Sequence, residues 1–263
     1  MDLRVAIIPR HAYAAPRLAA FADGLRAHGI EPDADPADCD LAVVWGVGDR
    51  AVIERQANQG RDVLVMEQGY IGDRAEYTSC GFNGLNGRAD FVLNNMPRDR
   101  WQKHKDLLRP WRKRGSGEFI VIMGQLPGDQ ALSGVDFRAW VHSSAAWFGE
   151  NAPDVRVVYR QHPNGSLRVE IPEVTGSLEQ CLKHAAMVVT FNSNSGVDGA
   201  LAGVPVIAVD AGSMARAVAA HELTINPPRP DRAQWARELA YCQWTTAEIA
   251  DGRAWDHLKW RYQ

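Results

Sequence analysis

The chain has 263 residues, of which 46% are hydrophobic and 23% are charged, and its formal net charge is −3. This composition is typical of a globular protein with one large or two small domains. No apolar run approaches the ~20 residues that a membrane-spanning helix needs. The four cysteines are scattered and form no Cys-x-x-Cys pair, so we expect reduced thiols, no structural zinc and a cytoplasmic location.

Strands and helices alternate through the first half of the chain. Leu18, Phe21 and Leu25 have helical spacing, and Gly29 is placed to end that helix. The expected strands are 3–8, 40–45, 63–66 and 90–93, and the expected helices are 15–28 and 49–58. Alternation of this kind predicts a parallel sheet covered by helices on both faces.

The same alternation restarts after a flexible break at Arg114-Gly115-Ser116-Gly117. The expected strands are 119–123, 155–159, 187–191 and 206–209, the expected helices are 135–148, 178–184 and 197–202, and the tail 232–260 is expected to be helical. The sequence therefore predicts two α/β domains, 1–114 and 115–263. We also expect the C-terminal helix to pack back on the first domain.

The most informative segment is the turn Asn192-Ser193-Asn194-Ser195-Gly196, between a buried strand and a short helix. Free N–H groups and the positive end of the helix dipole can hold an anion there. Asp198, just inside the helix, is placed to bind the two hydroxyls of a ribose. The segment suits a nucleotide diphosphate, although an ordinary βα turn with a Ser/Gly cap remains the alternative.

Other polar residues follow predicted strands, and ligands of open parallel sheets bind at the carboxyl ends of strands. Arg160 has the planar guanidinium that fits phosphate, with a surface ion pair as the alternative. His162 is a candidate for the donor phosphate or nucleoside, or a structural histidine. The residues at predicted strand ends are His11, Trp45, Gly46, Glu67, Gln125, Arg160, His162 and Asn192.

The segment from the Asn192–Gly196 turn onward contains Ser195-Gly196, Asp198, Gly203 and Pro205. This pattern resembles the donor-binding element of GT-B glycosyltransferases, in which Glu is the commoner acid. Three motifs occur along the chain: Glu67-Gln-Gly-Tyr70 with a Gly-Asn-Gly loop, Arg160-Gln-His-Pro163 and Asn192-Ser193. Their order resembles that in capsule-polysaccharide glycosyltransferases of the KpsS/KpsC type. The resemblance covers residues 40–210 in patches. It implies a GT-B fold, with two Rossmann-like domains facing a central cleft, the first for the acceptor and the second for a nucleotide-sugar donor.

The resemblance also implies roles for individual residues. The expected donor-binding residues are Gln125, Arg160, His162, Asn192, Ser193, Ser195, Gly196 and Asp198. No well-placed Asp-x-Asp pair is present, so we expect no metal and no cofactor besides the nucleotide-sugar co-substrate. The general base is expected from the first domain, with Glu67 as first choice, Asp49 as second and Asp73 as third, although a loop acid is more often only solvated.

A basic run with interleaved tryptophans extends from Arg98 to Arg114. Such a run can grip a phosphate backbone and stack bases, or it can be a solvated helix and linker. The expected acceptor-binding residues are Trp101, Lys103, Lys105 and Arg109. Two acceptors remain open: a glycan, or a hydroxymethylated base in DNA, as in phage DNA glycosyltransferases of GT-B form, which act in the host cytoplasm on an unstacked base.

Two other functions remain open. The non-hydrolysing UDP-sugar 2-epimerases share the fold, and a non-catalytic sugar-nucleotide or glycan-binding protein would share the donor motif. The sequence leaves open the sugar, the nucleotide, the stereochemical outcome and the oligomeric state.

Overall fold

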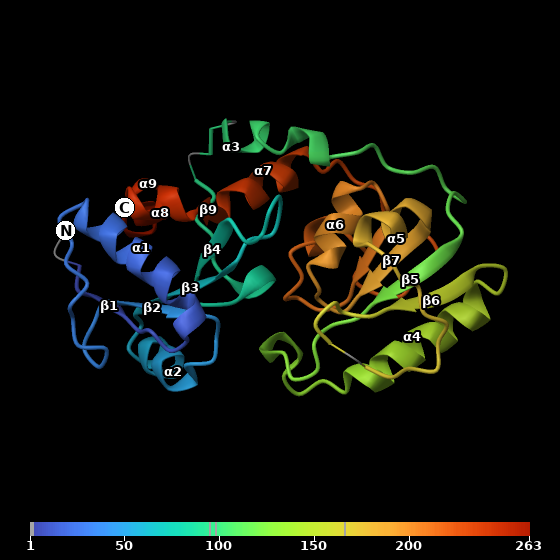
Figure 1. Ribbon diagram of the computed structural model, residues 1–263, viewed down its shortest axis with the longest axis horizontal. Coiled ribbons are helices and arrows are strands. Elements are labelled where there is room, and N and C mark those ends of the chain that lie inside the picture. The colour runs from blue at the N-terminus through green and yellow to red at the C-terminus, as the bar shows by residue number, and fades with distance from the viewer. Residues whose placement is uncertain (1–2, 95, 98, 166) are drawn as a thin grey trace. The chain divides into compact units, whose positions relative to one another are not determined.

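The structure is a computed structural model that describes residues 3–94, 96–97, 99–165 and 167–263 (Figure 1). The chain forms two compact units. The first unit contains the described residues up to Lys103 together with Arg237–Gln263, and the second contains His104–Ala236. The second boundary falls within helix α7 (Ala233–Tyr241). The sequence predicted a single boundary after residue 114, so residues 104–114 and 237–263 lie in the units opposite to those predicted.

The first unit is built on a five-stranded sheet with the order β1-β2-β3-β4-β9. Its strands are β1 (Val5–Ile7), β2 (Leu41–Trp45), β3 (Asp62–Gln68), β4 (Tyr77–Phe82) and β9 (Gln243–Thr245). The pairs β1–β2 and β2–β3 are parallel, but β3–β4 and β4–β9 are antiparallel. The prediction of a wholly parallel sheet is therefore wrong for this unit. The strand predicted at 90–93 is also wrong, because Asp90 contributes only an isolated bridge to Phe82.

The direction of β4 follows from the short connection before it. Only residues 69–76 separate β3 from β4, too few for the crossover that a parallel neighbour requires. β4 reads Tyr-Thr-Ser-Cys-Gly-Phe and is buried along its whole length, with Thr78 and Ser79 at its centre. A strand so rich in polar and small residues has no apolar periodicity to mark it.

Helices cover both faces of this sheet (Figure 1). They are α1 (Ala15–Arg26), α2 (Arg50–Asn58), α3 (Asp99–Gln102), α8 (Thr246–Ala250) and α9 (Arg253–Leu258). Leu64 and Met66 pack in one core with Phe21 of α1 and Trp255 of α9, while the alternating β3 residues Val63 and Val65 join the other core with α2. The C-terminal helices therefore pack on the first unit, as expected.

The second unit contains a four-stranded, wholly parallel sheet with the order β6-β5-β7-β8. Its strands are β5 (Phe119–Met123), β6 (Arg156–Arg160), β7 (Ala185–Thr190) and β8 (Val206–Ala208), and its helices α4 (Phe137–Asn151), α5 (Leu178–His184) and α6 (Ser195–Leu201) lie on its two faces (Figure 1). This arrangement is Rossmann-like, as predicted. Since β6 lies on one side of β5 and β7 on the other, the strand order reverses there, which is the topological switch point where ligands of such sheets bind.

None of the helices in the described ranges combines the length and the apolar character needed to cross a bilayer.

Candidate functional site

In the second unit, the predicted donor residues meet at one edge of the sheet. The four strands are parallel, so their carboxyl ends share that edge. Gln125 follows β5, Arg160 ends β6, Asn192 follows β7 and Asp210 follows β8. The sequence interpretation did not include Asp210, although its place directly after an apolar strand was the signal that marked the other three.

Gln125 and Asn192 form a buried hydrogen-bonded pair at the switch point. Gln125 Nε2 donates to Asn192 Oδ1 at 2.6 Å, and the Asn192 backbone N–H donates to Gln125 Oε1 at 3.1 Å. Asn192 Nδ2 donates to Asp210 Oδ1 at 2.9 Å and to the Ala131 carbonyl at 2.8 Å. These bonds occupy both amide hydrogens of Asn192, so the pair fixes the ends of β5, β7 and β8 relative to one another.

The Ser193–Gly196 turn forms hydrogen bonds within itself. Ser193 Oγ accepts from the backbone N–H and the hydroxyl of Ser195, at 3.2 and 2.8 Å. The Gly196 N–H donates to the Ser193 carbonyl at 3.0 Å. A side chain at Gly196 would meet Thr190 and Ala215 at 3.0 and 3.2 Å, so close packing favours glycine there. Asp198 lies half-buried on α6, and its contact with a ribose stays a prediction.

Arg160 carries a charge that no carboxylate balances within the part of the chain that the structure describes. Its guanidinium donates to the carbonyls of Gln161 (3.1 Å) and Gly176 (3.0 Å), and its Nε is buried without a hydrogen-bond partner. Carbonyl contacts hold the group in place but leave its charge uncompensated. An anion at this strand end would supply the missing partner.

His162 lies two residues beyond β6 and is half-buried. Its Nδ1 accepts a hydrogen bond from the Asn164 backbone N–H at 3.2 Å, so the neutral ring carries its proton on Nε2. Burial lowers the pKa of His162, and the positive charge of Arg160 lowers it further, against the opposing effect of Asp129. The ring is thus a neutral donor through Nε2 at pH 7.

The carboxyl edge of the first sheet presents a second group of polar residues. Asp49 precedes α2, and its Oδ1 accepts from Arg10 at 3.2 Å. Its Oδ2 is buried and has no hydrogen-bond partner among the described residues. The ion pair anchors one oxygen of the carboxylate and leaves the other as an uncommitted acceptor.

The other predicted bases are engaged locally. Glu67 lies within β3, and its Oε1 accepts from the backbone N–H of Gln68 at 2.9 Å. Asp73 is exposed and accepts from the Ala75 backbone N–H at 2.9 Å, as expected of an acid in a turn. A catalytic role for Glu67 stays a prediction.

An exposed aromatic side chain contacts the last residue of β2, the strand that precedes Asp49. Tyr13 is 65% exposed, stacks on His11 with ring centroids 5.3 Å apart, and meets the buried Trp45 edge-on at 6.1 Å. Arg17 lies over the Trp45 ring at 5.4 Å. The sequence interpretation included His11 and Trp45 but missed Tyr13, which precedes α1 in a 3₁₀ turn.

No protein-family model and no curated protein matches the sequence. Solved structures do match. One β-Kdo 2,4 transferase and one β-Kdo 2,7 transferase of Thermosulfurimonas dismutans KpsC align with TM-scores of 0.64 and 0.55. The first is 13% identical and covers 93% of this chain and 92% of its own. The second is 15% identical and covers 95% and 98%. The chain has the GT-B-like fold of these KpsC domains.

A UDP-GlcNAc 2-epimerase from Neisseria meningitidis also aligns, with a TM-score of 0.33 and 11% identity over 98% of this chain and 91% of its own. That score is too low to bear on function. The likeness to KpsC agrees with the resemblance stated from the sequence motifs. It establishes the fold, whereas the cleft predicted between the two domains remains a prediction.

The basic run is divided between several structural roles. Arg98 lies outside the described residues. Arg100 is buried and forms a bidentate ion pair with Glu248 at 2.9 and 3.1 Å, and Lys103 Nζ lies 3.5 Å from the same carboxylate. Lys105 and Arg109 are exposed, in the second unit. The described part of the run is therefore not one solvated helix, and binding of an acceptor by its exposed residues stays a prediction.

Its tryptophans are also engaged. Trp111 Nε1 donates to the Pro230 carbonyl at 2.7 Å, and the Arg232 guanidinium lies over its ring at 3.7 Å. Trp101 is half-buried.

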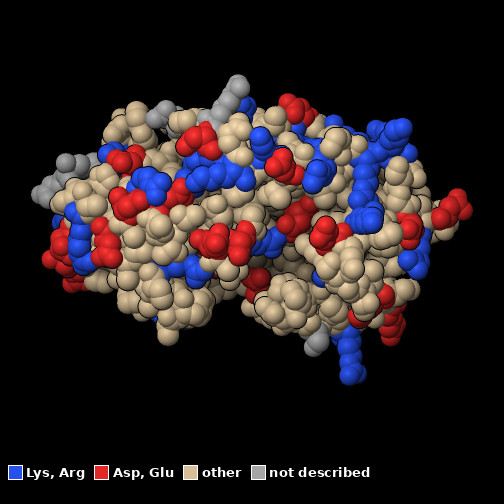
Figure 2. All heavy atoms as spheres, turned by 45° about the horizontal axis from the view of Figure 1, so that its top comes forward, with Lys and Arg blue, Asp and Glu red and all other residues tan. Residues whose placement is uncertain are grey.

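Acidic and basic side chains are interspersed on the face shown in Figure 2. Within the described ranges, no group of three His, Cys, Asp or Glu side chains is placed to hold a metal ion.

Proposed function

We propose that this protein is a glycosyltransferase that moves a sugar from a nucleotide-activated donor to a hydroxyl of a glycan. The observation that carries the proposal is the uncompensated guanidinium of Arg160 at the carboxyl edge of a wholly parallel sheet. The KpsC-like fold of the whole chain supports it. Transfer of Kdo, the sugar named for both KpsC domains, is the first reaction to test.

In the proposed reaction, the bond between the anomeric carbon and the donor phosphate oxygen breaks, and negative charge develops on the phosphate. Arg160 and the Nε2–H of His162 would stabilise that charge without a metal ion. Asp49 would accept the proton of the attacking hydroxyl on Oδ2, since Arg10 keeps the other oxygen occupied.

The acceptor is proposed to be a glycan because an exposed aromatic side chain contacts Trp45, at the end of the strand that precedes Asp49. The negative face of an exposed ring attracts the polarised C–H bonds of a pyranose, and Tyr13 is such a ring. A DNA acceptor would draw on Trp111, whose ring and Nε1 are already engaged. Hydroxymethylated DNA is kept as a comparison acceptor in the test below.

Replacing Arg160 by Ala is expected to weaken donor binding by ~1.5–3 kcal/mol, the range for hydrogen bonds to charged groups, or about 10–150-fold in Kd. Isothermal titration with the donor measures this. Arg156→Ala is the matched control, because Arg156 lies on the same strand at its opposite end. Equal donor affinity in the two variants would make Arg160 a structural residue.

The proposed function is tested with UDP-, GDP-, dTDP- and CMP-sugars, CMP-Kdo included, first by thermal shift and then with candidate acceptors by mass spectrometry. A mass increase of one sugar on an oligosaccharide, with release of free nucleotide, is expected. Transfer to hydroxymethylcytosine DNA would replace the glycan by DNA as acceptor. Conversion of the donor without any acceptor would indicate an epimerase, and binding without turnover a non-catalytic protein.

A further inference from the structure

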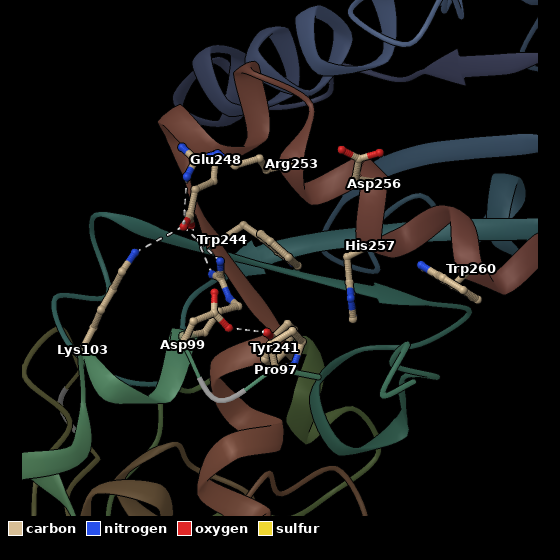
Figure 3. A pocket seen from close by; sticks show the side chains of 11 residues that line it. Pro97, Asp99, Lys103, Tyr241, Trp244, Glu248, Arg253, Asp256, His257 and Trp260 are labelled. Carbon is tan, nitrogen blue, oxygen red and sulfur yellow. Dashed lines mark hydrogen bonds and ion pairs between the residues drawn. The ribbon is translucent and has the colours of Figure 1, made fainter. Parts of the chain in front are cut away.

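A pocket of about 290 Å³ lies within the first unit, between α3, β9, α8 and α9 (Figure 3). β9 is the edge strand of the sheet, three strands from β2, which precedes Asp49. At ~4.8 Å per strand this separation is about 14 Å. Within the first unit, the pocket therefore lies apart from Asp49. Its volume lies just below the range for drug-sized ligands, about 300–1,000 Å³, which suits one small polar ring.

The floor of the pocket is held rigidly. Arg100 forms its two bonds to Glu248, donates to the carbonyls of Ala240 at 2.8 Å and Gln243 at 2.7 Å, and lies over the Trp244 ring at 3.9 Å. Tyr241 donates to Asp99 at 2.7 Å, and Lys103 reaches toward Glu248 from the turn after α3 (Figure 3). These contacts keep the floor in one arrangement before any ligand binds.

Four aromatic side chains line the pocket, and of these Trp260 is the exposed one. Trp260 is 41% exposed, and no described residue forms a ring contact with it. The rings of Tyr241 and His257 lie 5.0 Å apart and line the wall. Trp244 is 4% exposed, and its Nε1–H is buried without an acceptor in the described chain. Trp260 therefore offers an exposed ring to a ligand in the pocket.

Among the described residues, the charges that line the pocket are balanced. Three are cationic and three are acidic, namely Arg100, Lys103, Arg253, Asp99, Glu248 and Asp256. A balanced lining gives a phosphate or nucleotide no net attraction. A sugar hydroxyl both donates and accepts hydrogen bonds, so it can use ammonium, guanidinium and carboxylate groups together, while its ring C–H bonds face an aromatic side chain.

We propose that this pocket binds one pyranose unit of a neutral glycan, with Trp260 as the stacking platform. The inference rests on the proposed function in one respect: the glycan would be the acceptor, held at a unit remote from the one that receives the sugar. Binding at the pocket requires neither donor nor turnover, so it can be measured separately.

The test uses saturation-transfer NMR without donor, with maltotriose, mannotriose, galactotriose and triacetylchitotriose at millimolar concentrations. At least one trisaccharide is expected to receive saturation at its ring C–H protons. Trp260→Ala should weaken its binding about tenfold, as truncation of an aromatic anchor does, and Trp260→Phe should retain most of the affinity. Ile225→Ala, which truncates a 52% exposed apolar residue in the second unit, is the control and should leave binding unchanged.

The proposal is overturned if no trisaccharide binds, or if Trp260→Ala binds as well as the wild-type protein with an unchanged melting temperature. Binding of free UDP or CMP that Trp260→Ala abolishes would make the pocket a nucleotide site and also overturn it. Trisaccharide binding that depends on Trp260, without transfer from any donor, would leave the pocket assignment standing and contradict the proposed function. Sugar transfer that proceeds while no trisaccharide binds would support the proposed function and contradict the pocket assignment.

Discussion

An Asp49→Asn variant is expected to lose about 10²–10⁴-fold in kcat, the usual cost of removing a general base, while donor affinity stays near that of the wild type. The amide preserves the shape of the side chain and its contact with Arg10 through Oδ1. It replaces the acceptor at Oδ2, which has no hydrogen-bond partner among the described residues, by a group that cannot take a proton. Steady-state kinetics and donor titration on the same preparation separate the two effects.

Glu67→Gln is the comparison variant, because the sequence alone ranked Glu67 ahead of Asp49. Glu67 already accepts a backbone hydrogen bond within β3, so we expect this variant to keep most of its activity. A full rate in Asp49→Asn together with a large loss in Glu67→Gln would return the role of base to Glu67.

Replacing Arg100 by Ala is expected to destabilise the first unit by about 3–5 kcal/mol, the cost of breaking a buried ion pair by removing one partner. Glu248 is 4% exposed, and it would remain buried without its bidentate partner. The Ala240 and Gln243 carbonyls would lose their donor as well. Urea unfolding followed by tryptophan fluorescence measures the loss.

Two further variants test whether the loss of stability comes from the unpaired charge of Glu248. Arg100→Met combined with Glu248→Leu should recover most of the stability, because no buried charge is left unpaired. Arg253→Ala is the control, since the Arg253 side chain is 59% exposed and its guanidinium lies 4.0 Å from Glu248, and exposed pairs contribute about 0–1 kcal/mol. Unchanged stability in Arg100→Ala would show that the pair contributes nothing.

The same pair makes stability depend on pH. Burial raises the pKa of Glu248, but the hydrogen bonds from Arg100 and from the Thr245 backbone outweigh it and lower the pKa from 4.5 to about 2. A group with a lowered folded-state pKa stabilises the fold fully above its unfolded value. This contribution should therefore be complete above about pH 4.5 and be lost as the pH falls toward 2, and the loss should be absent in Arg100→Met/Glu248→Leu.

The sequence predicted the second unit well because each of its parallel strands contains an uninterrupted apolar run of at least three residues. β5 was predicted at its observed residues, and the edge that gathers Gln125, Arg160 and Asn192 followed from strand direction alone. The first unit was predicted less well. β4 is polar at its centre, and β9 has three residues within a tail that looked wholly helical.

The roles in the basic run depended on partners distant in sequence. Arg100 and Glu248 are 148 residues apart, and nothing local distinguishes Arg100 from its exposed neighbours. One signal was present: Thr245 and Glu248 have the spacing of a capping box, and they form one at the start of α8. That signal marks where α8 begins, but it does not show that Glu248 also neutralises Arg100.

The discontinuous first unit sets the order in which the chain can fold during its synthesis. The partner strand of β4 ends at Thr245, 142 residues after Lys103 (245 − 103). A ribosome adding about 5–20 residues per second needs about 7–28 s for that length. During that interval β4 is an open strand edge, which invites pairing with other chains. The second unit is continuous in sequence and can close first, so the part of the protein that begins the chain is the last to be completed.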